Sequence, residues 1–168
     1  MKLIKIYKPL TYFLVLPSAI VGLFSFVGFF VAIANPPFLL DVFITACSVV
    51  YFICSFIFLW RIIISQKTCK KIIKDLIKIN GYISVLFAVK ILFAFVALLI
   101  NPTILKTNIQ DAIAQNAANF PPNISVEMIV KFAWFLLSLI TIYAAVLLTH
   151  IIISFRLLKE YEKSFQSE

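Results

Sequence analysis

The sequence is poor in the residues that build catalytic and metal sites. It contains one histidine, three cysteines without a CxxC pair, and seven acidic residues among 168. A single histidine removes most arrangements for general-base catalysis and metal binding, and no acidic pair offers acid–base chemistry. The motifs GxxxxGK[ST], GxGxxG, HExxH and GxSxG are also missing. These absences predict a protein that is not an enzyme and carries no metal or other cofactor.

Charge is scarce as well, because only 13% of the residues are charged while 63% are hydrophobic. Soluble domains carry about 25% charged residues. One soluble core of this length could not bury so many apolar side chains, which predicts an all-α integral membrane protein surrounded by the lipid bilayer. The net charge of +8 does not indicate nucleic-acid binding, because the basic residues lie beside apolar segments and form no separate basic domain.

Four segments are long enough for membrane-spanning helices, which need about 20 apolar residues. They are residues 10–34, 38–64, 82–100 and 132–155. Helices are expected because the segments are too long, and lack the alternating pattern, for the strands of a membrane barrel. We therefore expect residues 1–168 to form a single transmembrane domain, a four-transmembrane-helix bundle.

The distribution of lysine and arginine predicts the orientation. Twelve of the fifteen precede the first span, lie at or between the inner ends of the second and third spans, or follow the fourth. Lys106 and Lys131 lie on the other side, and Lys90 lies within the third span. The positive-inside rule then places both termini and the loop of residues 66–81 in the cytoplasm, with residues 101–131 as an outer loop. The expected location is the plasma (inner) membrane.

The cytoplasmic loop reads as an amphipathic helix with apolar residues at helical spacing and lysines off that stripe, ended by Asn80-Gly81. Such a helix would lie on the inner leaflet and attract anionic lipid. A loop anchored by snorkelling lysines is the alternative. The residues assigned to this cytoplasmic interface are Arg61, His150, Lys70, Lys71, Lys74 and Lys78.

The outer loop contains two local helix signals. Residues 107–120 show a modest amphipathic pattern, which predicts a short helix lying on the membrane. Ser125 has the position of an N-cap for the fourth helix, with Glu127 in the first turn.

A repeat of the segment ends suggests two tandem helical hairpins. The first and third spans end in Asn35-Pro36 and Asn101-Pro102, while the second and fourth end in "RIIIS" from Arg61 and "HIIIS" from His150. Parallel repeats of this kind occur in transporters. Isoleucine is abundant here and Asn-Pro commonly ends helices, so chance similarity is the alternative.

Lys90 is the most unusual residue, because it lies inside the third apolar span. Helical spacing puts it on one stripe with Ala94, Ala97 and Asn101, which we expect to face the bundle. No span centre carries an acidic residue, and Asp41 is expected at the outer interface, so Lys90 is predicted to lack a carboxylate from its own chain. The polar groups assigned to a candidate intramembrane site are Lys90, Asn101, Ser48, Tyr51, Ser138 and Thr141.

These features support two hypotheses about function. The first is a non-catalytic membrane protein that acts through helix contacts, either an accessory or assembly subunit or an immunity-type protein. Its partners would be another membrane protein or a second copy of itself. The second is a small oligomeric channel or transporter with Lys90 as an anion or proton site. A purely structural Lys90, snorkelling or bonded to hydroxyl groups, remains the third interpretation of that residue.

Overall fold

The computed structural model describes residues 2–115 and 125–166, and within them the chain forms five α-helices. These are α1 (Lys2–Ala34), α2 (Leu39–Phe58), α3 (Lys71–Ile100), α4 (Thr103–Gln115) and α5 (Val126–Glu160). Four helical segments are long and apolar enough to cross a membrane, namely Leu3–Ala34, Pro36–Ile64, Lys71–Ile100 and Val126–Glu160. The predicted all-α four-helix bundle is therefore confirmed.

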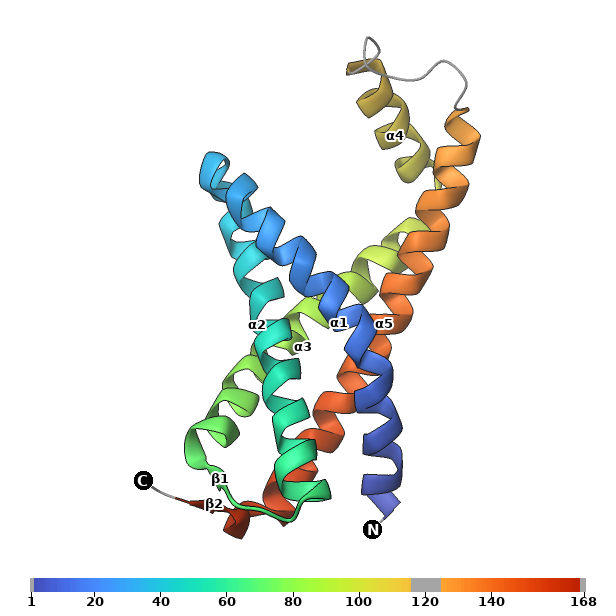
Figure 1. The fold of residues 1–168 in the computed structure, drawn as a ribbon. Helices are drawn as coiled ribbons and strands as arrows, with labels where there is room; N and C mark the ends of the chain where they lie inside the picture. The colour runs from blue at the N-terminus through green and yellow to red at the C-terminus, as the bar shows by residue number, and fades with distance from the viewer. Residues whose placement is uncertain (1, 116–124, 167–168) are drawn as a thin grey trace.

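The helices give the molecule two unlike ends. Figure 1 shows the N-terminus, the C-terminus and the connection from α2 to α3 at one end, which we call the terminal end. The α1–α2 connection and α4 lie at the opposite end, which we call the hairpin end. Because the chain crosses the bundle in alternating directions, each pair α1–α2 and α3–α5 forms a helical hairpin.

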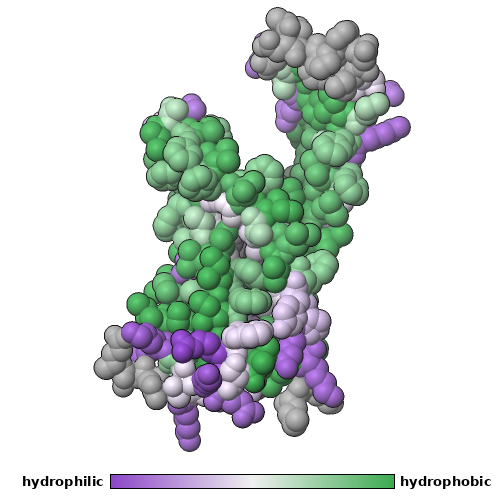
Figure 2. Space-filling view, in the orientation of Figure 1, coloured by the Kyte–Doolittle hydropathy of each residue, from purple (hydrophilic) through white to green (hydrophobic). Residues whose placement is uncertain are grey.

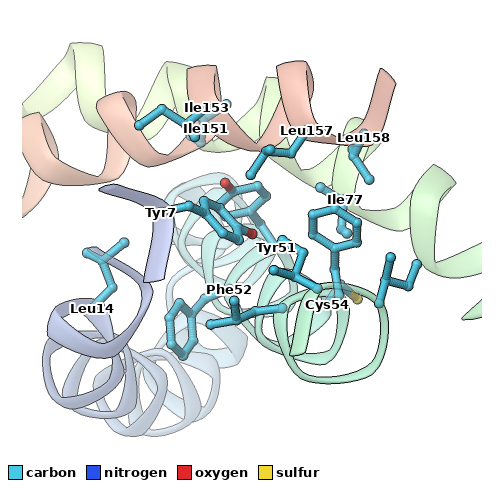
Figure 3. Close-up of a cluster of buried hydrophobic side chains, with 14 of the residues drawn as sticks. Tyr7, Leu14, Tyr51, Phe52, Cys54, Ile77, Ile151, Ile153, Leu157 and Leu158 are labelled. Atoms are coloured by element: carbon cyan, nitrogen blue, oxygen red, sulfur yellow. The ribbon is translucent and has the colours of Figure 1, made fainter. Parts of the chain in front are cut away.

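The packed core lies at the terminal end, where side chains from α1, α2, α3 and α5 meet. Figure 3 shows Tyr7 of α1 and Tyr51 of α2 beside apolar residues of α5 and Ile77 of α3. The larger side chains that are essentially fully buried here are Tyr7, Leu14, Tyr51, Phe58, Leu59, Ile62, Ile77, Leu147, Ile151, Leu157 and Leu158. Interlocked side chains of this size hold the four helices together at this end.

The hairpin end is open by comparison. In Figure 1 the tip of the α1–α2 hairpin leans away from the upper part of α5, and Figure 2 shows separate apolar arms there. Two prolines, Pro9 and Pro17, lie inside α1. Proline lacks the N–H that continues the helical ladder, which accounts for the bend of α1 visible in Figure 1. The bend carries the second half of α1 away from α5.

Short elements at the terminal end tie the C-terminus to the α2–α3 connection. A π-helical turn, η2 (Leu59–Ile64), ends the second span, and β1 (Cys69–Lys70) pairs in parallel with β2 (Phe165–Gln166). The 3₁₀ turn η4 (Glu162–Ser164) precedes β2 and places Glu162 beside Lys74, with 2.5 Å between Oε1 and Nζ. The Phe58 and Phe165 rings stack with centroids 5.9 Å apart.

The helix ends at the hairpin end follow the predicted Asn-Pro signals. Asn35 and Asn101 have nearly the same backbone angles, φ −134° and ψ 83° against φ −133° and ψ 79°. Proline disfavours the helical conformation for the residue before it, so both helices end there. After Asn35 a 3₁₀ turn, η1 (Pro36–Phe38), leads into α2. The two-hairpin repeat stays a prediction, although these equivalent turns agree with it.

The predicted cap of the fourth span is confirmed. The Ser125 hydroxyl accepts a hydrogen bond from the Met128 amide at 3.2 Å, and Glu127 lies in the first turn of α5. Of the predicted outer helix over residues 107–120, the part up to Gln115 is helical within α4. The remainder lies outside the described residues.

One predicted boundary is wrong. The Asn80-Gly81 pair does not end a loop helix, because α3 runs without a break from Lys71 to Ile100. Gly81 is buried, and a Cβ built there would lie 2.9 Å from two ring carbons of Phe155. This glycine therefore permits close approach of α3 and α5 inside a continuous helix.

Candidate functional site

A buried polar cluster crosses the core at the terminal end, and we call it the His150 cluster. Each of three helices contributes a polar pair four residues apart, which places both members on one helical face. The pairs are Tyr7 with Thr11 on α1, Tyr51 with Ser55 on α2, and His150 with Ser154 on α5; all six side chains are 0% exposed. The cluster thus joins the first, second and fourth spans.

His150 is the centre of this cluster because both ring nitrogens have partners. Nε2 lies 2.9 Å from Thr11 Oγ1, and Nδ1 lies 2.8 Å from Tyr51 Oη. Thr11 donates its own proton to the Tyr7 carbonyl oxygen at 2.8 Å, so it accepts from Nε2–H of the imidazole. We therefore assign the neutral Nε2–H tautomer, in which Nδ1 accepts the Tyr51 proton.

The Ser154 hydroxyl connects Tyr51 to Tyr7 within the His150 cluster, whereas the buried Ser55 hydroxyl has no hydrogen-bond partner among the described residues. Ser154 Oγ lies 2.8 Å from Tyr51 Oη and 3.3 Å from Tyr7 Oη, and Tyr7 donates to the Ser55 carbonyl oxygen at 3.4 Å. The Tyr7 ring also stacks on the imidazole, with centroids 4.6 Å apart and an angle of 17° between the planes. Hydrogen bonds and ring packing together fix the orientation of the histidine.

The structure corrects two assignments made from the sequence. His150 was expected at the cytoplasmic interface, but it is fully buried between α1 and α2. Tyr51 was assigned to a site with Lys90, but its hydroxyl bonds His150 and Ser154. Sequence reasoning missed Tyr7 and Thr11 altogether. The matching i, i+4 polar pairs on three helices were the signal that could have found them.

The other hydroxyl groups assigned to the intramembrane site bond elsewhere. Ser48 donates to the Thr45 carbonyl at 2.7 Å, Ser138 to the Trp134 carbonyl at 2.9 Å, and Thr141 to the Leu137 carbonyl at 2.7 Å. Hydroxyls that bond the preceding turn of their own helix are satisfied without a partner helix. Asn101 accepts from the Thr103 hydroxyl at 2.5 Å. None of these contacts involves Lys90.

Lys90 has an acidic partner, contrary to the expectation from the sequence. Its Nζ forms an ion pair with Oδ1 of Asp41, and the two side chains are 63% and 52% exposed. The neighbouring helices α2 and α3 bring them together, although Asp41 is in the first turn of α2. By helical rise, Lys90 lies about 15 Å before the end of α3, whereas Asp41 lies near the start of α2. The tilt of α3 and the long lysine side chain bring the two charges together.

The face of α3 that packs into the bundle also differs from the predicted one. Lys90, Ala94, Ala97 and Asn101 are all exposed. The buried stripe instead contains Ile77, Gly81, Ser84 and Ala88, which follow the same helical spacing. Small residues let backbones approach closely, so Gly81 and Ala88 decide which face of α3 meets its neighbours.

The basic residues assigned to the cytoplasmic interface divide into two groups. Arg61, Lys71 and Lys78 are exposed, whereas Lys74 is almost buried and pairs with Glu162. The hydrogen bond from Lys74 and the charge of Lys74 hold the pKa of the Glu162 carboxyl below its usual value. Lys70 lies in β1 beside the C-terminal strand. Lys74 therefore stabilises the connection to the C-terminus.

A shallow apolar groove of about 320 Å³ lies between α1 and α2 toward the hairpin end. Small residues on both helices leave this space beside two phenylalanines. The groove is lined by Gly22, Ser25, Phe26, Phe29, Val42, Ala46, Val49 and Val50. We call it the α1–α2 groove, and its lining is suited to aliphatic groups.

Among the described residues, no group of three or more histidine, cysteine, aspartate or glutamate side chains is placed to hold a metal ion. The fold and these sites define a small all-α helix bundle with four helices that are long and apolar enough to span a membrane. No family model, curated protein or solved structure matches the chain.

Proposed function

We propose that this chain is a non-catalytic multi-pass protein of the plasma membrane that acts through helix contacts within the bilayer. It would serve as an accessory or assembly subunit of another membrane protein, or as an immunity-type protein that binds a toxin helix in the bilayer. The proposed partner is a membrane-spanning helix of another protein.

The observation that carries this proposal is the unequal packing of the two ends. The terminal end has a closed core and the His150 cluster, whereas the hairpin end leaves large apolar side chains exposed on every long helix. Examples are Phe24, Phe26, Phe30, Phe43, Phe93, Ile100, Phe132 and Phe135. A bundle that is closed at one end and open at the other offers surface for an added helix.

The α1–α2 groove is the proposed contact for that helix. Lipid tails are as apolar as leucine, so helices associate in membranes by close packing and polar contacts. The short side chains of Ser25 on α1 and Ala46 on α2, together with Gly22, leave room for another helix to approach closely. A partner helix with small or aliphatic residues on one face would fit there, between the exposed phenylalanines.

Orientation and lipid contacts complete the proposal. The concentration of lysine and arginine at the terminal end supports a cytoplasmic location for both termini. Exposed Arg61, Lys71 and Lys78 would face anionic lipid headgroups at that surface. No interaction with nucleic acid is proposed.

Photocrosslinking in native membranes tests the helix-contact function. A photoreactive amino acid replaces Ser25 or Val49 in the groove, and Ile152 of α5 serves as the matched control. Ile152 is an exposed apolar residue of the closed end, at 57% exposure. Discrete protein adducts from the groove positions and none from Ile152 are expected. Adducts with lipid alone at every position would contradict the proposal.

The second candidate function is a small oligomeric channel or transporter. It is favoured by one observation, the exposed charges of Lys90 and Asp41 on the side of the bundle, which could line a pore only between copies of the chain. Ion or proton flux through liposomes that contain the purified protein tests it. Flux that Lys90→Ala abolishes would support transport, and the absence of flux in the wild type would eliminate it.

A further inference from the structure

The Lys90–Asp41 pair is a charged feature on the side of the bundle, inside the helical segments Pro36–Ile64 and Lys71–Ile100 that are apolar enough to span a membrane, with Asp41 in the first turn of α2. The ammonium and the carboxylate are in contact, yet each side chain is more than half exposed. Charges facing hydrocarbon are strongly unfavourable, and they are stabilised when further polar partners replace water. We therefore expect this surface to bind a partner that carries one positive and one negative group.

A second copy of this chain has the required charges in the required places. Lys90 and Asp41 touch, so they lie at the same depth in the membrane. A two-fold axis along the membrane normal preserves depth and orientation while exchanging left and right. Rotation about such an axis beside this surface places the lysine of one copy opposite the aspartate of the other, which is the self-complementarity of an isologous interface.

We propose that two copies of the chain associate through this surface, with Lys90 of each copy paired to Asp41 of the second copy. Each ammonium then lies between two carboxylates, and each carboxylate between two ammonium groups. Ala94 and Ala97, which are exposed on the same face of α3 as Lys90, allow the two α3 helices to approach closely. The charges fix the register, and the alanines remove steric obstacles.

This inference goes beyond the proposed function, because it uses another face of the molecule. The α1–α2 groove is lined on α2 by Val42, Ala46 and Val49, which lie about 80° to 140° around the helix from Asp41 at 100° per residue. A dimer through the Lys90–Asp41 surface leaves that groove open. Failure of dimerisation would leave the photocrosslinking result at Ser25 and Val49 unaffected.

Two charge reversals test the proposal when they are combined in separate copies. Lys90→Asp gives a copy with two acidic groups at this surface, and Asp41→Lys gives a copy with two basic groups. Each variant loses the contact within its own chain and repels itself. Co-expression of the two variants with different affinity tags restores opposite charges only across an interface between copies.

The expected results follow from that arrangement. Differently tagged wild-type copies co-purify, and each variant co-purifies with itself at least about tenfold less, since close charge pairs across interfaces are coupled by more than 1.4 kcal/mol. The mixture of Lys90→Asp with Asp41→Lys recovers co-purification. The Lys106→Asp control reverses an exposed charge on α4 and leaves association unchanged. Helical content measured by circular dichroism identifies variants that fail to fold.

Three outcomes would overturn the dimer. Wild-type copies that never co-purify, or are never crosslinked in membranes, exclude it. A mixture that associates no better than either variant alone shows that the charges do not meet across an interface. Association that neither charge reversal weakens places the contact on another surface.

Discussion

Nδ1 of His150 lies 2.8 Å from the phenolic oxygen of Tyr51, and this contact joins α5 to α2 inside the closed end of the bundle. Both residues are fully buried. Every polar atom of the imidazole is satisfied by a hydroxyl group from another helix. The relationship explains how an otherwise apolar core specifies which helix faces meet.

Tyr51→Phe should therefore destabilise the protein. The substitution leaves Nδ1 of His150 buried without a donor, which costs about 1–3 kcal/mol. Thermal unfolding in detergent, followed by circular dichroism, measures the change. Tyr82→Phe is the control, because Tyr82 is 66% exposed and its loss of a hydroxyl should change the free energy of unfolding by less than about 0.5 kcal/mol. Equal effects of the two substitutions would disprove a role for the hydrogen bond.

Gly81→Ala should also destabilise the bundle, although alanine is the better helix former. The added Cβ would lie 2.9 Å from two carbons of the Phe155 ring, so either the ring must move or α3 and α5 must separate, at a cost of about 1–3 kcal/mol. Gly28→Ala is the matched control, because its Cβ meets only a Val42 methyl group at 3.4 Å. That control should be neutral or slightly stabilising. Unfolding midpoints of the two variants that move together would contradict the close contact.

The stability of the protein should fall in acid partly through Glu162. Lys74 holds the pKa of this carboxyl below its usual 4.5, so the ion pair contributes stability above that value. The contribution is lost as the pH falls through the lower pKa of the folded state. Melting temperatures of the wild type and Glu162→Gln should converge from about pH 6 to pH 3. A constant difference over that range would show that the carboxylate charge is not involved.

The proposed orientation predicts where fusion reporters end up. A reporter that works only in the cytoplasm should be active when it is attached after Glu168, because twelve basic residues favour a cytoplasmic location for that side of the protein. A reporter inserted between Pro36 and Pro37, in the α1–α2 connection, should report the opposite side. Cytoplasmic activity at both positions would refute the four-span topology, and outer activity after Glu168 would reverse it.

The architecture was predictable because bilayer thickness sets a simple length requirement. Apolar runs of about 20 residues are visible without knowing what they contact. Local chemistry also predicted the turns at Asn35 and Asn101 and the Ser125 cap, since each depends on neighbours a few residues away. The break expected at Asn80-Gly81 was wrong, because α3 continues through both residues and Gly81 packs against the Phe155 ring of α5.

The candidate site was harder to predict, because hydropathy does not distinguish a helix face turned to lipid from one turned to another helix. The stripe that contains Lys90, Ala94 and Ala97 and the stripe that contains Gly81, Ser84 and Ala88 both include small residues at helical spacing. Only the second is buried. Likewise, the sequence separation of 139 residues between Thr11 and His150 leaves no local sign of their contact.

The sequence by itself determined the class of molecule, the number of helices that can span a membrane and the ends of several of them. These properties depend on composition and on interactions within one helix. Tertiary structure alone decided that His150 is buried, that Lys90 pairs with Asp41 on the outside, and that the bundle closes at one end. These three features depend on how the helices tilt and on which small residues let neighbouring helices approach. Both are properties of the assembled bundle and of no single helix.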